Sequence, residues 1–431
     1  MASRLLLGNE ALQDCICLPK PIPPKEVKVH LETTRRMKAH TFAVVDSNGA
    51  WMERWRQQFQ ALGIEFLRSN DGMHPDAFSH TSLSVWAASN NRNDYLALDN
   101  LPDDRSFHGN FKAPSNEMML DFCAHVVEMG CLQNNLYQGH VQSLEPCDSG
   151  VNVVVNTNGG VEKISAKHVV IARGPTWNRQ WPSFYKTLDT AALAQINHAW
   201  DIFDNPDRMK KHQGRGVIVG GGLTSAHLCV QLAGNGSIDL LIRRNRRVKQ
   251  YDLDLSWMES TPERRQLREN FEQAPVEERA ATNKAVRDGG SISPELNSAL
   301  SELETKGLVK VHEFTEIVSA SWDDCWTLTL SNDEVITSDY LICATGTRVD
   351  IFEDPLLATL QHVHPLRMVG GLPVLSEQLQ WGELPIHLMG NMAALELGPD
   401  AVNMSGAMRG AFRIWPALSS KRPRQKNTTS K

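Results

Sequence analysis

The sequence predicts an α/β fold that contains two Rossmann-like domains, one of them inserted in the other. Short apolar runs that stop at glycine, asparagine or aspartate alternate with segments of helical periodicity, as expected for parallel strands joined by helices. A glycine-rich turn lies between such a run and a helical segment near the middle of the chain. The 431 residues are enough for about two or three domains.

The composition indicates an ordinary globular protein without a surface for nucleic acid. Hydrophobic residues make up 41% of the chain and charged residues 22%, and the formal charge is −6, whereas polyanion binding needs a basic face. The apolar runs are too short for a transmembrane helix, and residues 1–10 lack the apolar stretch of a secretory signal. We expect a cytoplasmic protein with a small-molecule substrate, no nucleic-acid partner and no membrane span. The oligomeric state is left open.

The first part of the chain predicts a strand, a helix and a long loop. Residues 1–40 are expected to be an irregular N-terminal segment, because prolines at positions 19, 21, 23 and 24 interrupt regular structure. The apolar run from Thr41 to Val45 predicts a buried strand that ends at Asp46. Apolar residues at positions 52, 55, 59 and 62 predict a helix, and the polar residues of 70–112 predict a long surface loop.

Further along the chain, helix and hairpin patterns alternate with buried strands. We expect a helix at 118–129, a hairpin of strands 151–155 and 161–164, buried strands at 168–172, 216–219, 238–242, 340–344 and 385–389, and meander strands at 309–311, 326–330 and 335–336. The charged segment 252–306 predicts a helical insertion, either a partner-binding lid or a solvated excursion.

The sharpest motif is the unit from Gly216 to Arg244, in which a strand, a glycine-rich turn, a helix and a second strand follow one another. Gly220 permits a tight turn, Gly222 lets the backbone approach a pyrophosphate, and Ser225 is small enough for close packing of helix on strand. The anion would lie at the helix N-terminus, where free N–H groups and the helix dipole favour it. The complete unit predicts a nicotinamide dinucleotide site.

Arginines rather than acids follow the second strand of this unit. An NAD site places Asp or Glu about 20 residues after the glycines, whereas Arg243 and Arg244 stand at that point here, with Arg246 and Arg247 after them. Guanidinium groups suit the 2′-phosphate of NADPH through charge-assisted, bidentate hydrogen bonds. The pattern favours NADPH over NADH, and the alternative is a solvated basic loop.

Three further features predict a second nucleotide site. Asp46 ends a strand, as does the acid that binds a ribose hydroxyl in a first Rossmann unit. A strand that stops at Thr345 and Gly346 has a degenerate copy at 168–174, with arginine in place of the threonine. The third feature is a glycine motif after a buried strand that leads into a helix, made of Gly390, Asn391, Leu395, Gly398, Pro399 and Asn403.

In this order the features resemble the two-dinucleotide flavoproteins. Within them they are most similar to the NADPH-dependent flavin monooxygenases near the lysine and ornithine N-hydroxylases and related FAD/NAD(P)-binding proteins. Residues 66–69 and 74–76 look like that family's segment beside the flavin ring, and 251–257 looks like its segment just past the NADPH arginines. The resemblance covers about residues 41–415.

The resemblance implies FAD and NADPH as cofactors and assigns residues to each. For NADPH these are the residues of the glycine unit, namely Gly220, Gly222, Ser225, Arg243 and Arg244. For FAD they are Asp46, Arg68, Ser69, His74, Gly390, Asn391, Pro399 and Asn403. His74 and Asn403 have a purely structural role as their alternative.

The same resemblance implies a discontinuous FAD-type domain of residues 41–205 and 345–418, into which an NADPH domain of residues 210–344 is inserted. Residues 419–431 are expected to be a basic disordered tail, either a nuclear localisation patch or a solubilising extension.

The sequence departs from this family in two places. The G-x-G-x-x-G expected about 25–30 residues before Asp46 is missing, since Gly8 is the only glycine before Gly49. Either the N-terminus is truncated or altered, or FAD binding is lost. The family's terminal Gly-Asp is Gly390 and Asn391 here, and asparagine can still hydrogen-bond a hydroxyl.

No C-x-x-C pair is present among the eight cysteines, which are expected to be reduced thiols. This argues against a disulfide reductase and favours direct reaction of reduced flavin with oxygen. The sequence therefore predicts an NADPH-dependent, FAD-containing oxidoreductase, a monooxygenase that hydroxylates a small nucleophilic substrate. The alternative is a non-catalytic, degenerate dinucleotide-binding protein. No catalytic acid or base, no metal site and no particular substrate is predicted.

Overall fold

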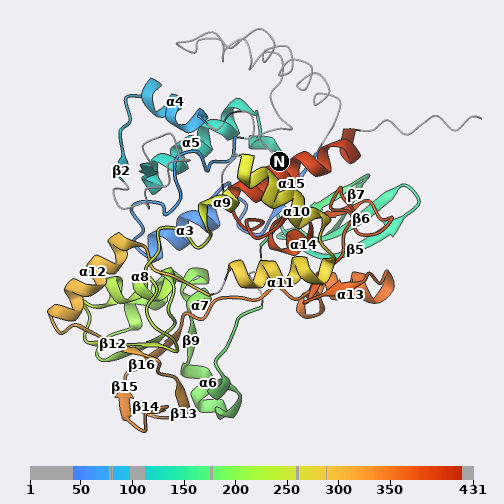
Figure 1. The fold of residues 1–431 in the computed structure, drawn as a ribbon. Helices are drawn as coiled ribbons and strands as arrows, with labels where there is room; N and C mark the ends of the chain where they lie inside the picture. Colours follow the sequence, from blue (N-terminus) through green and yellow to red (C-terminus); the bar gives the residue numbers. More distant parts are fainter. Residues whose placement is uncertain are drawn as a thin grey trace, which may run out of the picture.

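The computed structural model describes residues 42–419 apart from 77–78, 80, 98–111, 175–177, 259–261 and 288. The predictions for residues 1–40 and for the basic tail beyond Ser419 lie outside the described residues. Figure 1 shows a mixed α/β molecule whose upper part contains α4 (Ser82–Ser89), α5 (Asn116–Met129) and α15 (Met404–Ser419), and whose lower part is built around a parallel sheet. Among the described helices, none is long and apolar enough to cross a membrane.

A five-stranded parallel sheet organises the lower part, in the order β12-β11-β10-β16-β9. Its strands are β9 (Asn197–His198), β10 (Gly216–Val219), β11 (Ile238–Ile242), β12 (Val309–Glu313) and β16 (Tyr340–Cys343). The central strand is β10, which pairs with β11 on one side and β16 on the other. The strands predicted at 216–219, 238–242 and 340–344 are confirmed as members of one sheet.

The prediction that 309–311 belongs to a meander is wrong. β12 pairs in parallel with β11, and the meander is formed instead by β13 (Ile317–Asp323), β14 (Cys325–Leu330) and β15 (Val335–Ser338). Local apolar patterns do not distinguish these strands. β12 differs from the meander strands because it pairs with β11, although the whole helical insertion lies between the two strands in the sequence.

Alternating side chains of the parallel sheet bury two different cores. Ile218 packs with apolar residues of α8 (Leu223–Leu232) and α12 (Pro294–Thr305) on one face. Its neighbour Val217 packs on the other face with residues of α6 (Thr190–Gln195) and the meander. Residues 184–203 also lie in these two cores, so part of the segment assigned to the FAD-type domain packs against the NADPH-type sheet.

Two small parallel sheets lie in the upper part. β1 (Val44–Asp46) pairs in parallel with β4 (Leu136–Gln138), and β8 (Val169–Ile171) pairs in parallel with β19 (Ile386–Leu388). The predicted hairpin is confirmed within a three-stranded antiparallel sheet of β5 (His140–Cys147), β6 (Gly150–Thr157) and β7 (Gly160–Ala166). One apolar core joins β6, β8 and β19 to α15.

The predicted helices near 52–62 and at 118–129 are confirmed as α3 (Glu53–Ala61) and α5. The prediction of a continuous loop over 70–112 is wrong, because α4, β2 (Tyr95–Ala97) and β3 (Lys112–Pro114) lie in or next to it. Leu83 of α4 is buried in a cluster with Phe122 of α5, so tertiary packing holds a helix whose own sequence has little amphipathic pattern.

The helical insertion is confirmed as α9 (Leu255–Met258), α10 (Pro262–Gln273) and α11 (Val276–Val286), followed by α12. α11 packs against α14 (Ala394–Leu397) and lies between the lower sheet and the upper part (Figure 1). The remaining elements are α7 (Ala199–Asp204), α13 (Pro355–Val363), β17 (Met368–Val369) and β18 (Leu372–Pro373).

Three imidazoles, of which His198 and His212 are buried and His227 is half-buried, predict that stability depends on pH. Burial lowers the pKa of His198, His212 and His227 from 6.5 to about 4. Between these two values the unfolded chain binds protons that the folded protein does not, so stability falls as the pH falls through this window. The expected slope is about 1.4 kcal/mol per pH unit for each imidazole.

His212→Phe isolates one of these contributions, because the new ring cannot titrate and can keep the contact with Tyr340, whose ring centroid lies 4.8 Å from that of His212. We expect the unfolding free energy of this variant, measured with urea between about pH 7 and about pH 5, to fall less steeply than that of the wild type. Equal slopes would show that His212 titrates normally in the folded protein.

Candidate functional site

The carboxyl edge of the parallel sheet gathers the residues predicted to bind NADPH. Because all five strands run in one direction, the segments that follow them meet at this edge. The chain passes from β10 to β11 and β12 on one side and then returns to β16 on the other, so the strand order reverses between β10 and β16. Ligands of open α/β sheets bind outside the carboxyl ends of the strands at such a switch point.

Gly220 lies directly at the switch point. Its N–H donates to the carbonyl of Leu241 at 3.0 Å, and the N–H of Ala344 donates to the carbonyl of Val219 at 2.8 Å. A Cβ on Gly220 would stand 2.4 Å from the carbonyl oxygen of Ala344, and the φ of Gly220 is +147°. Only glycine meets both conditions without displacing the neighbouring strand.

The N-terminus of α8 opens onto the same edge. Gly222 is the N-cap residue and no side chain caps this end of the helix, while the buried Ser225 donates its hydroxyl hydrogen to the carbonyl of Gly222 at 2.8 Å. Segment 289–291 lies over the turn, since a Cβ on Gly290 would be 2.9 Å from the Cα of Gly222. The glycine turn therefore leads into an uncapped helix N-terminus, and Gly290 packs directly against Gly222.

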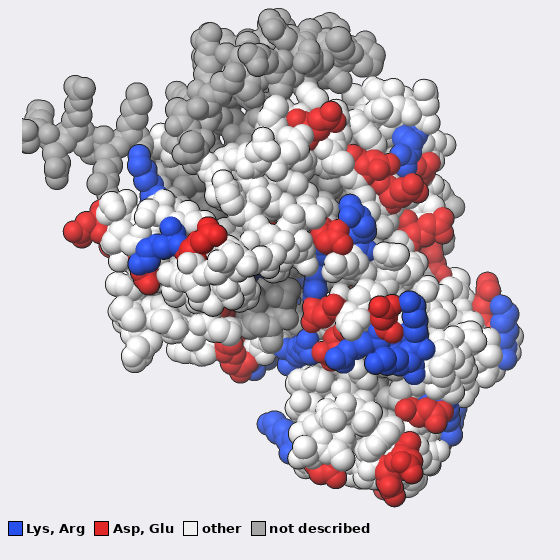
Figure 2. Space-filling view, turned by 180° about the vertical axis from the view of Figure 1, so that it is seen from behind, with Lys and Arg blue, Asp and Glu red and all other residues white. Residues whose placement is uncertain are grey.

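Arg243 and Arg244 follow β11 at this edge, and both are exposed. The N–H of Phe314 donates to the carbonyl of Arg244 at 3.2 Å, which fixes the two segments side by side. Arg246 forms an ion pair with Glu304, with its Nη1 2.6 Å from the carboxylate. On the face seen in Figure 2, basic side chains gather where the upper and lower parts of the molecule meet, with acidic side chains among them.

Arg68, predicted beside the flavin, reaches across to the lower part. Its guanidinium donates to the carbonyls of Gln250 at 2.5 Å and Lys249 at 2.7 Å, and to the Asp252 carboxylate at 2.7 Å. It also donates to the Ser291 hydroxyl at 2.7 Å. Each of the three guanidinium nitrogens thus donates to segment 249–252, which follows the arginines predicted to bind NADPH, and Arg68 ties the two parts of the molecule together.

His74 and Ser69, also predicted beside the flavin, differ in exposure. His74 is fully buried, with its ring edge-on to Phe122 at a centroid distance of 5.3 Å, whereas Ser69 is half-buried. Because Phe122 belongs to the α5 core, this contact favours the structural role for His74.

The residues predicted to hold FAD at the ends of β1 and β19 lie after strands of two different small sheets. One carboxylate oxygen of Asp46 accepts the N–H of Asn48 at 2.7 Å. Gly390 has a φ of +66° and open space where a Cβ would stand, and Asn391 beside it is half-buried. These residues supply no pyrophosphate turn, and the sequence has no such motif before Asp46.

Three polar residues of the α11 region, which the sequence analysis missed, donate to the predicted FAD segment. Their bonds run from Arg279 to the carbonyl of Leu395, from Asn283 to that of Ala394 and from Arg287 to that of Pro399, at 3.0, 2.8 and 2.6 Å. The donors are spaced by four residues and so share one helix face. Two of the acceptors are carbonyls of α14, and that of Ala394 also accepts the N–H of Gly398 at 2.9 Å. The spacing of the donors was the one indication in the sequence.

A buried carboxylate follows in the same segment. Asp400 is 1% exposed and accepts hydrogen bonds from Arg409 at 2.5 Å and from Ser405 at 2.9 Å, with Arg268 at 3.9 Å. Burial and the nearby Arg409 lower the pKa of Arg268 to about 10. Pro399 is buried beside this network. Asn403 is half-buried and directly precedes α15, and its carbonyl accepts the N–H of Ala407.

The arginine that replaces threonine after β8 is a structural group. Arg173 pairs with Asp354, which is fully buried and also caps α13 by accepting the N–H groups of Leu356 and Leu357 at 2.9 and 3.0 Å. The pair anchors the end of β8 to α13.

The described cysteines are all free thiols. Burial raises the pKa of Cys123 to about 12, and burial also raises the pKa of Cys229 and Cys343. Thiols in such surroundings stay protonated and unreactive at neutral pH. Within the described part of the chain, the site therefore holds no redox pair of cysteines.

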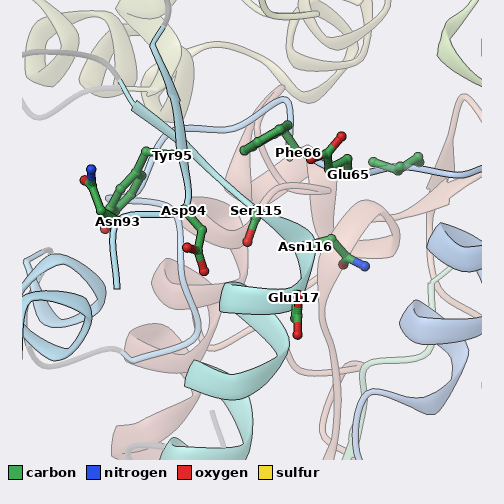
Figure 3. A pocket seen from close by; sticks show the side chains of 9 residues that line it. Glu65, Phe66, Asn93, Asp94, Tyr95, Ser115, Asn116 and Glu117 are labelled. Atoms are coloured by element: carbon green, nitrogen blue, oxygen red, sulfur yellow. The ribbon is translucent and has the colours of Figure 1, made fainter. Parts of the chain in front are cut away.

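A separate hollow of about 560 Å³ lies in the upper part, lined by residues 64–66, 93–95 and 115–117 (Figure 3). Asn93, Asp94 and Tyr95 lie on one side of it, and Asn116 and Glu117 at the start of α5 lie on another. Because carboxylates line this hollow, it does not suit the phosphates of a dinucleotide.

No protein-family model and no curated protein sequence matches the chain. In structure the chain is similar to the ornithine hydroxylase of Pseudomonas aeruginosa, with 15% sequence identity, a TM-score of 0.66 and 97% of each chain covered. It is also similar to the ornithine N-hydroxylase of Kutzneria sp. 744, whose structure contains reduced FAD, NADP+ and L-ornithine, with 16% identity, a TM-score of 0.66 and 97% of this chain and 95% of that one covered.

A third similar structure is the FAD-bound cadaverine monooxygenase of Erwinia amylovora, with 14% identity, a TM-score of 0.64 and 88% of each chain covered. The predicted resemblance to the FAD- and NADPH-dependent N-hydroxylating monooxygenases is thus confirmed at the level of the fold.

Gly220→Ala should destabilise the protein, because the added methyl group would meet the Ala344 carbonyl and the backbone would keep an unfavourable φ. We expect a loss of about 2 kcal/mol or more in the free energy of unfolding, measured with urea. The control is Gly234→Ala, where a Cβ meets no atom within 4 Å, and it should cost less than about 1 kcal/mol. A Gly220→Ala protein as stable as this control would contradict the conclusion that position 220 requires glycine.

Proposed function

We propose that the protein is an NADPH-dependent, FAD-containing oxidoreductase, a monooxygenase that hydroxylates a small nucleophilic substrate. One observation carries the proposal: a glycine cradle at the switch point of a parallel sheet, with two exposed arginines after the neighbouring strand. The likeness in fold to ornithine and cadaverine hydroxylases supports the same reading.

In this proposal the lower sheet binds NADPH. The pyrophosphate lies at the turn of Gly220 and Gly222, where the helix dipole and free N–H groups of α8 stabilise it. Arg243 and Arg244 bind the 2′-phosphate, and each charged hydrogen bond contributes about 1.5–3 kcal/mol. Gly290 packs against Gly222 and so limits the room that the coenzyme has at this turn.

FAD would occupy the upper part, between the ends of β1 and β19. Asp46 and Asn391 would bind its sugar hydroxyls, and Gly390 leaves room for the chain that joins ring and phosphates. The bound flavin would accept a hydride from NADPH and activate oxygen. Arg68 and the donors of α11 hold the upper and lower parts at a fixed distance, which orients the two cofactors toward each other.

A second candidate is a non-catalytic dinucleotide-binding protein that has lost FAD. It is favoured by the missing pyrophosphate motif before Asp46, since Gly8 is the only glycine ahead of Gly49. In this case the lower sheet would still bind NADPH, and the upper part would serve as a scaffold.

Titration with FAD separates the two candidates. We expect the full chain to bind FAD with a dissociation constant near micromolar or tighter, to turn yellow and to oxidise NADPH. Oxidation should quicken with amine substrates such as ornithine or cadaverine, which the similar enzymes hydroxylate. Protein that stays colourless with added FAD, yet binds NADPH, would favour the second candidate.

The preference for NADPH is tested by removing both arginines. Because the 2′-phosphate loses its charged partners, Arg243→Ala with Arg244→Ala should weaken NADPH binding by about tenfold or more per contact and leave NADH binding nearly unchanged. Calorimetric titration of both coenzymes measures the effect. As a control for net charge, Lys210→Ala with Lys211→Ala removes two exposed cations from the segment before β10, outside the turn that follows β11. Equal affinity of the wild type for both coenzymes, or equal losses in the arginine variant, would refute the assignment.

A further inference from the structure

Phe314 combines two unfavourable features. It follows β12 directly, with a backbone φ of +52°, a region that bulky side chains rarely adopt. Its side chain is also 70% exposed, so the ring gains little from burial. Leu379 shows the contrast, since its φ of +57° accompanies a side chain with no exposure at all. Strain of this kind, without a packing benefit, is typical of residues kept for a ligand.

The position of Phe314 is fixed by hydrogen bonds to the end of β11 and to the residues just after it. Its N–H donates to the carbonyl of Arg244 at 3.2 Å, and the N–H of Thr315 donates to the carbonyl of Ile242 at 3.0 Å. The exposed ring therefore stands at the carboxyl edge of the parallel sheet, next to the two arginines that follow β11.

We propose that Phe314 is the stacking surface for the adenine ring of the coenzyme. The inference rests on the proposed NADPH site and adds to it the residue that recognises the base. In an adenosine 2′-phosphate the base and the phosphate are attached to adjacent ribose carbons. A phosphate bound by Arg243 and Arg244 therefore brings the base to the residues beside them. An exposed aromatic ring at that place stacks on a purine, and a cationic guanidinium next to it strengthens the contact.

The test uses 2′,5′-ADP, which carries the base and the 2′-phosphate, and nicotinamide mononucleotide, which carries neither. In Phe314→Gly the dissociation constant of 2′,5′-ADP should rise by about tenfold, and that of nicotinamide mononucleotide should stay unchanged. Phe314→Trp keeps an aromatic face and should bind 2′,5′-ADP as the wild type does. The matched control is Phe352→Gly, a phenylalanine that is 61% exposed on another surface, and it should leave both constants unchanged.

Stability supplies a second measurement. Glycine adopts a φ of +52° without strain, so the midpoint of thermal unfolding of Phe314→Gly should stay within about 2 °C of the wild type. Unaltered binding of 2′,5′-ADP by Phe314→Gly would overturn the stacking role, and so would a loss of affinity that comes with a lower midpoint. A wild-type protein that does not bind 2′,5′-ADP would refute the proposed coenzyme site itself, and the stacking role with it.

Discussion

The carbonyl oxygen of Ala344 stands 2.4 Å from the point where any side chain at position 220 would begin. This close approach lets β10 and β16 run side by side to their carboxyl ends, with the N–H of Ala344 bonded to Val219 at 2.8 Å. The chain then turns at Gly220, and α8 starts after Gly222 with its N-terminus at the edge of the sheet. Because β11 pairs in parallel with β10, and β12 with β11, the carboxyl ends of these strands lie at the same edge.

Polar side chains tie the two parts of the molecule together close to this edge. Arg68 reaches from the upper part to the segment after the arginines, and the donors of α11 reach back to α14. Segment 289–291 contacts both systems, since Gly290 lies on Gly222 and the hydroxyl of Ser291 accepts a hydrogen bond from Arg68. A displacement of the glycine turn would therefore move segment 289–291 and change the hydrogen bond between Ser291 and Arg68, which joins the two parts.

Features encoded within a short stretch could be predicted from the sequence, and those that depend on distant partners could not. The unit from Gly216 to Arg244 was predictable because its strand, turn and helix are contiguous. The parallel pairing of β12 was not, and neither was the role of Arg68, whose partner Gln250 lies 182 residues away. The predicted NADPH residues meet at one edge, whereas those predicted for FAD are divided between strand ends and the buried His74.

Main-chain carbonyls accept hydrogen bonds alike whatever residue carries them. Apart from Glu396, whose carboxylate pairs with Arg279 at 3.0 Å, segment 394–399 can therefore change its side chains, within the limits of packing, and still accept the three hydrogen bonds from the α11 region at its carbonyls. The donors have no such freedom, because Arg279, Asn283 and Arg287 share a face only while four residues separate them. One inserted residue would turn each later donor by about 100° around the helix axis. Among related proteins, the number of residues in α11 should therefore vary less than the amino-acid sequence of segment 394–399, to which its donors bind.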